Sequence, residues 1–166
     1  MLAMRQAGPG DLAAIEAMQH AAYAPNRVLL GVEPLPLQAD YRAVLRDYDV
    51  WLAEAAAGTG LSLAGVLVLR AESGALLIWS IATAPEAQGR GVANRLLQRA
   101  ETSARALGLA SMTLYTGEKL VQNIAWYARH GFVVTRREAL PDRVIVHMEK
   151  VLVPRVIRTE GRVSLV

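Results

Sequence analysis

The residues of this chain best suited to chemistry form a glycine-containing loop, Gln88 to Asn94, which lies between an apolar run and an amphipathic segment. The first N–H groups of a helix have no intrahelical partners and carry a partial positive charge, so a loop that leads into a helix is a natural anion site. Gly89 and Gly91 permit backbone conformations closed to larger residues, and Arg90 and Arg95 can screen phosphate charge. The loop therefore fits a pyrophosphate, although an ordinary strand-to-helix turn would use such glycines as well.

The same loop excludes two common nucleotide-binding motifs. A dinucleotide site requires G-x-G-x-x-G and an acidic residue about 20 positions later, but Asn94 stands at the last glycine position and the stretch near Leu109 is apolar. A Walker A loop requires a Gly-Lys-Ser/Thr ending, which is absent here. Binding of a dinucleotide or a nucleoside triphosphate is therefore not expected.

Tyr127 is the second candidate for chemistry, because it lies one helical turn before Gly131 in a short apolar segment. A phenol whose pKa is near 10 is protonated at pH 7 and can donate a hydrogen bond to a developing anion. The alternative is an aromatic residue that only packs in the core. The three histidines show no metal-ligand spacing and the chain has no cysteine, so no metal site is expected.

The elements that position these residues follow from the hydrophobic pattern. Apolar residues at helical spacing predict helices at 12–22, 37–48, 92–107 and 123–130, and the proline-containing stretch 25–36 predicts a loop. Short apolar runs predict strands at 1–7, 50–55, 61–69, 75–83, 111–115, 132–137 and 144–150. We therefore expect an α/β fold with a central, mixed but mostly antiparallel sheet of about seven strands flanked by about four helices.

Length and composition favour one domain, since 166 residues with 53% hydrophobic content can bury a sizeable core. We assign residues 1–153 to this domain. In residues 154–166, apolar residues alternate with arginines, which fits a tail, an added strand or a partner contact, and we favour a tail.

Cysteine content, hydropathy and charge disfavour several classes of protein. Absence of cysteine permits a reducing compartment, and neither a signal peptide nor an apolar run long enough to cross a membrane is present, so a cytoplasmic protein without membrane contact is expected. The net charge of +3 comes from scattered arginines that are not interleaved with aromatics, which argues against nucleic-acid binding.

Two motifs, in this order, resemble the GNAT superfamily of N-acetyltransferases over roughly residues 4–152. The first is Q/R-x-x-G-x-G/A, matched by Gln88, Gly91 and Ala93 after a strand that ends in Ile81 to Pro85. In the second, an asparagine leads a short helix that carries a tyrosine and ends in Gly-Phe; it is matched by Glu118, Asn123, Ile124, Ala125, Tyr127, Gly131 and Phe132.

This resemblance implies acetyl-CoA as cosubstrate and assigns the site residues. The backbone of Ile81, Ala82 and Thr83 would pair with pantetheine as an extra strand would, Asn123 would bind the pantetheine arm, and Tyr127 would act as general acid toward the CoA thiolate. The sheet would splay between its fourth and fifth strands, and the acceptor would approach near residues 28–41. The main-chain amides that would hold the CoA pyrophosphate are those of Gln88, Gly89, Arg90, Gly91, Val92, Ala93 and Asn94.

The general base is the least defined part of this assignment. Members of the family often carry a glutamate on the strand before the phosphate loop, but this strand has Trp79 and Ser80 and no carboxylate. Glu33 and Glu54 are candidates acting through water, although a solvated surface role fits both better. At pH 7 an alkylamine of pKa near 10.4 costs about 4.6 kcal/mol to neutralise and an α-amine of pKa near 8 about 1.4 kcal/mol. A missing base therefore favours a less basic amine or a water route to bulk solvent. Trp79 either shapes an apolar acceptor pocket or packs in the core.

The resulting hypothesis is an N-acetyltransferase that moves acetyl from acetyl-CoA to a primary amine, of a small molecule or a peptide, by direct nucleophilic attack. Two alternatives remain: a non-catalytic acetyl-CoA-binding module of the same fold, and an enzyme that acetylates protein N-termini. Both a monomer and a homodimer are compatible with the sequence.

Overall fold

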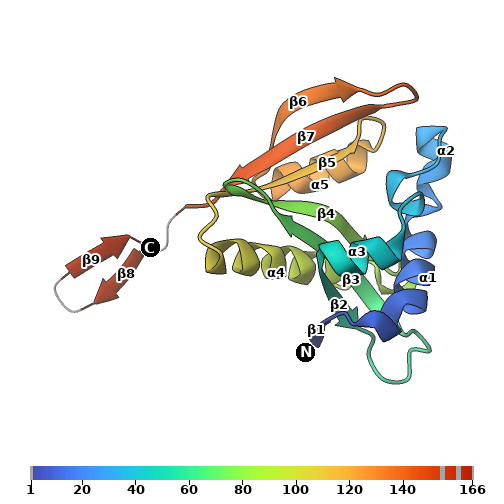
Figure 1. Ribbon diagram of the computed structural model, residues 1–166, viewed down its shortest axis with the longest axis horizontal. Coiled ribbons are helices and arrows are strands. Elements are labelled where there is room, and N and C mark those ends of the chain that lie inside the picture. Colours follow the sequence, from blue (N-terminus) through green and yellow to red (C-terminus); the bar gives the residue numbers. More distant parts are fainter. Residues whose placement is uncertain (1, 154–155, 160–161, 166) are drawn as a thin grey trace.

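The computed structural model describes residues 2–153, 156–159 and 162–165. One seven-stranded sheet, in the order β1-β2-β3-β4-β5-β7-β6, organises the fold (Figure 1). Its strands are β1 (Met4–Gln6), β2 (Asp49–Glu54), β3 (Leu63–Ala71), β4 (Ala75–Thr83), β5 (Ser111–Gly117), β6 (Val133–Ala139) and β7 (Val144–Val151).

In the described part of the chain, five α-helices flank this sheet: α1 (Leu12–Tyr23), α2 (Asn26–Leu30), α3 (Tyr41–Asp47), α4 (Val92–Ala106) and α5 (Val121–Arg129). Every neighbouring pair of strands is antiparallel except β4 and β5. The predicted fold class, a mixed and mostly antiparallel sheet with helices around it, is confirmed.

The core is thickest at the centre of the sheet. All residues of β3 from Leu63 to Leu69 are buried, so both faces of this strand are covered, and α1 and α4 both contact β3 and β4. Figure 1 shows the sheet between these two helices. The face of α4 that packs here consists of Val92, Leu96, Leu97, Ala100, Ser103 and Ala104, at the spacing typical of an amphipathic helix.

β4 and β5 pair over three residues only, from Ala75 opposite Ser111 to Leu77 opposite Thr113. Beyond this point β4 continues beside β3 to Thr83, and β5 continues beside β7 to Gly117. The edges of β4 and β5 that face each other beyond Leu77 and Thr113 are therefore free of strand partners, and the sheet opens between them as expected from the sequence.

A bulge interrupts β4 in the same region. Val68 of β3 lies opposite Ser80, whereas the next residue, Leu69, lies opposite Ile78, so Trp79 is the extra residue on β4. A bulge bends its strand and changes the direction of local backbone groups. β4 is therefore bent close to where it leaves β5.

The segment between α1 and β2 differs in part from the sequence prediction. Residues 25–36, expected to be a loop, include α2, which ends at Gly31 with φ of 70°. The second predicted helix begins at Tyr41 instead of residue 37, because Asp40 accepts a hydrogen bond from the N–H of Arg42 and caps α3 there. The preceding residues Leu35–Leu37 form a single 3-10 turn.

Two short strands follow the seven-stranded sheet. β8 (Val156–Thr159) and β9 (Arg162–Leu165) pair antiparallel with each other in a separate two-stranded sheet. Residues 154, 155, 160, 161 and 166 of the predicted tail lie outside the described part. The boundary between a domain at 1–153 and a C-terminal segment at 154–166 stays a prediction.

Among the described residues, no helix has both the length and the apolar character required to cross a lipid bilayer.

Gly65 provides a test of the packing between β3, β4 and α4. A Cβ atom at this position would lie 2.9 Å from the carbonyl oxygen of Ala82 and 2.9 Å from side-chain carbons of Leu96 and Val92. We expect Gly65→Ala to lower the free energy of unfolding by about 1–3 kcal/mol, because the backbone of β4 must shift. Urea denaturation followed by circular dichroism measures this change.

Gly10→Ala is the matched control, since a Cβ atom there would meet nothing within 4 Å and the backbone φ is not positive. Its unfolding midpoint should equal that of the wild type. An unchanged midpoint for Gly65→Ala would contradict the tight contact between β3 and β4.

Candidate active site

Three adjoining hollows run from the start of α4 to the opening between β4 and β5. The first lies at the loop before α4, the second lies between β4 and α5, and the third lies between β4 and β5. The second and third share Tyr23, Asn26, Ile81, Asn123 and Tyr127 among their walls. Together they form one path along β4, which we call the β4 channel.

The first hollow is formed by the loop predicted to bind pyrophosphate. Gly89 and Gly91 have φ of 74° and 78°, a backbone region that favours glycine, and Gly91 is the N-cap of α4. No side chain caps this helix, so its first N–H groups remain available to an anion. The walls are Thr83, Ala87, Gln88, Gly89, Gly91, Val92, Ala93, Asn94 and Trp126.

Arg90 is the one residue of the predicted loop that is not in the wall of this hollow. Arg90 is exposed, and its side chain forms no hydrogen bond or ion pair with the described residues. The side chain of Val92 is buried in the core, so only its backbone is available to a ligand.

Asn94 connects the loop to α5. Nε2 of His130 lies 3.0 Å from Oδ1 of Asn94, and Nδ1 of the same ring lies 2.7 Å from the carbonyl oxygen of Trp126. The His130 and Trp126 rings lie 4.2 Å apart between centroids. The C-terminal end of α5 is thereby held against the first turn of α4.

The second hollow brings together the other predicted cofactor residues. Its walls include Ile81, Ala82 and Thr83 of β4 on one side and Asn123 and Tyr127 of α5 on the other. Asn123 and Tyr127 are four positions apart and therefore share one face of α5. The edge of β4 that faces them has lost β5 as its partner, so main-chain groups there can receive an extended ligand.

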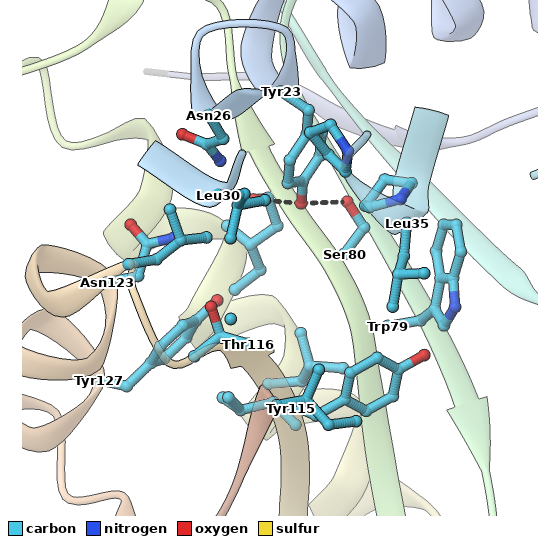
Figure 2. A pocket seen from close by; sticks show the side chains of 18 of the residues that line it. Tyr23, Asn26, Leu30, Leu35, Trp79, Ser80, Tyr115, Thr116, Asn123 and Tyr127 are labelled. Carbon is cyan, nitrogen blue, oxygen red and sulfur yellow. Dashed lines mark hydrogen bonds between the residues drawn. The ribbon is translucent and has the colours of Figure 1, made fainter. Parts of the chain in front are cut away.

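A polar network not foreseen from the sequence fixes β4 against α1. Gln19 is fully buried, and its Nε2 donates a hydrogen bond of 3.0 Å to Oγ of Ser80. The Tyr23 hydroxyl lies 2.7 Å from the same Oγ and donates to the carbonyl oxygen of Ile81 at 3.2 Å. Figure 2 shows the Tyr23 and Ser80 hydroxyls joined across the top of the third hollow.

The phenols of Tyr23 and Tyr127 face the channel from opposite sides (Figure 2). Burial raises the pKa of Tyr23 to about 12, although its hydrogen bond with Ser80 acts in the other direction. Burial also raises the pKa of Tyr127 well above its usual value, and the neighbouring Tyr23 adds to this effect. Both phenols therefore carry their proton throughout the ordinary pH range.

The third hollow has mostly apolar walls. Leu30, Pro34, Leu35 and Pro36 line it from the loop region that was expected to admit the acceptor. Trp79 lines this hollow and also packs against the rings of Tyr41 and Tyr48, at centroid distances of 6.2 and 5.7 Å. Its role in an acceptor pocket stays a prediction.

Neither candidate base lines the β4 channel in the described part of the chain. Glu33 is ion-paired with Arg27 at 2.8 Å, which lowers the pKa of the carboxyl, and Glu54 is ion-paired with Arg5 at 2.9 Å. Among the described residues, the walls of the third hollow include no carboxylate at all.

The structure thus gathers the two sequence motifs around one channel and adds residues from α1, α2 and the turn before β7. Tyr23, Asn26, Gln19 and Ser80 were not predicted. The sequence offered one indication of this network, namely a glutamine on the apolar face of the first helix. Arg143, just before β7, was not predicted either and is considered below.

Comparison with solved structures shows the same fold elsewhere. The PaiA N-acetyltransferase of Thermoplasma acidophilum in complex with coenzyme A matches with a TM-score of 0.71 at 17% identity, over 92% of this chain and 99% of that chain. The ribosomal-protein-S18-alanine N-acetyltransferase of Escherichia coli matches with a TM-score of 0.72 at 16% identity, over 98% and 99% of the two chains. At these identities the likeness shows the fold alone.

Sequence comparison adds a curated relative and a family. An IAA acetyltransferase of Azospirillum brasilense is 35% identical over 68 residues, which span 41% of this chain and 44% of that relative. The sequence profile described as the acetyltransferase (GNAT) family matches residues 15–132, which include both motifs. The chain therefore belongs to the acetyltransferase (GNAT) family, and the matched domain is an acyltransferase that uses acetyl-CoA.

Proposed function

We propose that the protein transfers the acetyl group of acetyl-CoA to a primary amine by direct attack of the amine nitrogen on the thioester. The observation that carries this proposal is the β4 channel, which joins an anion-binding helix start to an apolar hollow through the free edge of β4. A long cosubstrate with a diphosphate at one end and a reactive group at the other fits such a path.

The main-chain amides from Gln88 to Asn94 are proposed to hold the diphosphate, because Gly89 and Gly91 keep the loop open and no side chain caps α4. The backbone of Ile81, Ala82 and Thr83 would pair with pantetheine, with Asn123 binding it from α5. The bulge at Trp79 makes the main chain there the candidate donor to the thioester carbonyl, since the pairing with β3 is interrupted at this residue.

Tyr127 is proposed to donate a hydrogen bond to the leaving thiolate. Full transfer of a proton from an unperturbed phenol to a thiolate of pKa near 8.5 costs about 2 kcal/mol, and burial of Tyr127 increases this cost. The proton is therefore shared with the sulfur and replaced from the amine. Orientation of the two reactants supplies the larger part of catalysis in this scheme.

The amine reaches the enzyme without a nearby base, because no carboxylate lines the third hollow in the described residues. This favours an acceptor of modest basicity or deprotonation by bulk water before binding. The likeness to the S18-alanine enzyme keeps acetylation of protein N-termini as an alternative, and a binding module without catalysis is a second one. Turnover of free amines in preference to peptides would separate our proposal from both.

Gly91→Ala tests the diphosphate assignment. A residue with a Cβ atom at φ of 78° costs about 1–2 kcal/mol in this backbone region, so the loop should relax away from its open form. We expect the dissociation constant of acetyl-CoA to rise about tenfold, measured by isothermal titration calorimetry.

The matched control is Gly58→Ala, because Gly58 has a similar φ of 82° but lies in the loop between β2 and β3, away from the channel. This variant should lose stability to a similar extent and bind acetyl-CoA as the wild type does. If Gly91→Ala bound acetyl-CoA as tightly as the wild type does, the loop could not be part of the cosubstrate site.

Tyr127→Phe tests the proposed acid. Removal of a general acid costs about 10²- to 10³-fold in rate, so kcat should fall by this factor while the KM for acetyl-CoA changes little. Tyr48→Phe is the control, since the Tyr48 hydroxyl accepts a hydrogen bond from Arg70 outside the channel and its loss should leave kcat unchanged. A kcat of Tyr127→Phe within twofold of the wild-type value would exclude Tyr127 as the general acid.

The pH profile provides an independent test of the same residue. Because burial raises the pKa of Tyr127, its proton is retained as pH rises, and no descending limb due to this phenol should appear below about pH 10. The value of kcat/KM for the amine should instead rise with pH until the acceptor is neutral. A loss of kcat between pH 8 and 10 that Tyr127→Phe abolishes would contradict the raised pKa.

A further inference from the structure

Arg143, which lies between β6 and β7, is a half-buried residue in the wall of the third hollow. Its side chain is 6% exposed, whereas the side chain of its ion-pair partner Asp142 is 50% exposed. No other charged residue lines this hollow in the described part of the chain. A guanidinium is thus placed beside apolar walls while its counter-charge lies half in solvent.

The hydrogen bonds of Arg143 leave one side of its guanidinium free. Nε donates to Oδ1 of Asp142 at 3.0 Å and Nη2 donates to Oδ2 at 2.9 Å, which uses two of the five N–H groups. Nη1 donates no hydrogen bond to any of the described residues. The edge formed by Nη1 and the second N–H of Nη2 has the geometry that binds a carboxylate with two parallel hydrogen bonds.

The surroundings of Arg143 do not supply that second carboxylate. In the small hollow that Arg143 also lines, Glu118 is ion-paired with Arg137, and Nζ of Lys119 lies 3.5 Å from the carbonyl oxygen of Leu30. Glu118 is therefore already neutralised, and Lys119 adds a second positive charge. The part of the third hollow next to Arg143 therefore favours an anion.

We propose that the acceptor is an amino acid in the broad chemical sense: a primary amine that also carries a carboxylate, which pairs with the free edge of Arg143. This inference rests on the proposed function, and it specifies the class of amine. The apolar part of the acceptor lies against Leu35, Leu120 and Ile145, which line the same hollow. An acceptor with a second positive charge is disfavoured, because it would meet the positive charges of Arg143 and Lys119.

The test compares each acid with its carboxamide, which lacks this charge. Because the carboxamide also makes the neighbouring amine less basic, kcat/KM is calculated from the concentration of neutral amine in each case. Leucine and phenylalanine are paired with their carboxamides, and β-alanine and 4-aminobenzoate with theirs, so that several distances between amine and carboxylate are sampled. For the pair in which the distance between amine and carboxylate lets the carboxylate reach Arg143, wild-type kcat/KM should be about 10- to 100-fold higher for the acid than for the amide. This factor is expected for hydrogen bonds between charged groups.

Arg143→Gln should reduce this ratio to about one while turnover of the amide stays within about threefold, and Arg143→Lys should keep part of the preference. Arg46→Gln is the matched control: Arg46 binds the adjacent Asp47 through the same two nitrogens, at 2.9 and 3.0 Å, but is exposed on α3. The ratio should be unchanged in this variant. Retention of the full preference by Arg143→Gln would overturn the proposal.

A second measurement needs no variant and decides the matter if Arg143→Gln does not fold. 4-Methylpentanoate, which has a carboxylate but no amine, should inhibit the wild type competitively with the acceptor, whereas 4-methylpentanamide should not. Equal inhibition by both, or acetylation of every amide as fast as its acid, would overturn the Arg143 assignment and leave the proposed N-acetyltransferase intact. Failure to acetylate any amine, acid or amide, would overturn both.

Discussion

The proposed function of this protein depends on the loss of pairing between two strands that start as neighbours. β4 and β5 share a ladder for three residues and then follow different partners, β3 and β7. In a continuous sheet, the edge of β4 from Ile78 to Thr83 would bind a strand of the same chain. Here that edge remains free beside the start of α4, so one exposed main-chain edge and one uncapped helix start lie along a single channel.

α1 holds β4 in position where β4 no longer pairs with β5. Gln19 and Tyr23, one turn apart, both bind the Ser80 hydroxyl, and Tyr23 also binds the carbonyl of Ile81. Because buried polar groups must be satisfied, this network fixes α1 and β4 relative to each other. It also occupies, with neutral groups, the part of β4 where a carboxylate base would have stood. A neutral wall and the Arg143 side chain, which is 6% exposed, give the third hollow its electrostatic character.

Much of the fold could be predicted, because its elements depend on local patterns. The predicted bounds of β4 agree with the structure, and those of α1 and α4 agree within one residue. α2 was missed because its five residues are too few to show periodicity between Pro25 and Gly31. Candidate cosubstrate residues could be proposed from the sequence because they lie in two contiguous motifs. Ser80, Tyr23 and Arg143 were not, because they meet only through the topology of the sheet, and a single arginine next to an aspartate resembles any surface pair.

The central claim is that the free edge of β4 and the uncapped start of α4 together bind acetyl-CoA, and a crystal structure with coenzyme A tests it most directly. The account predicts diphosphate oxygens at about 3 Å from main-chain nitrogens between Gly89 and Asn94. It also predicts a pantetheine arm hydrogen-bonded along Ile81 to Thr83, with its sulfur near Tyr127. A complex in which the diphosphate lies elsewhere, or in which side chains fill the opening between β4 and β5, would contradict the account.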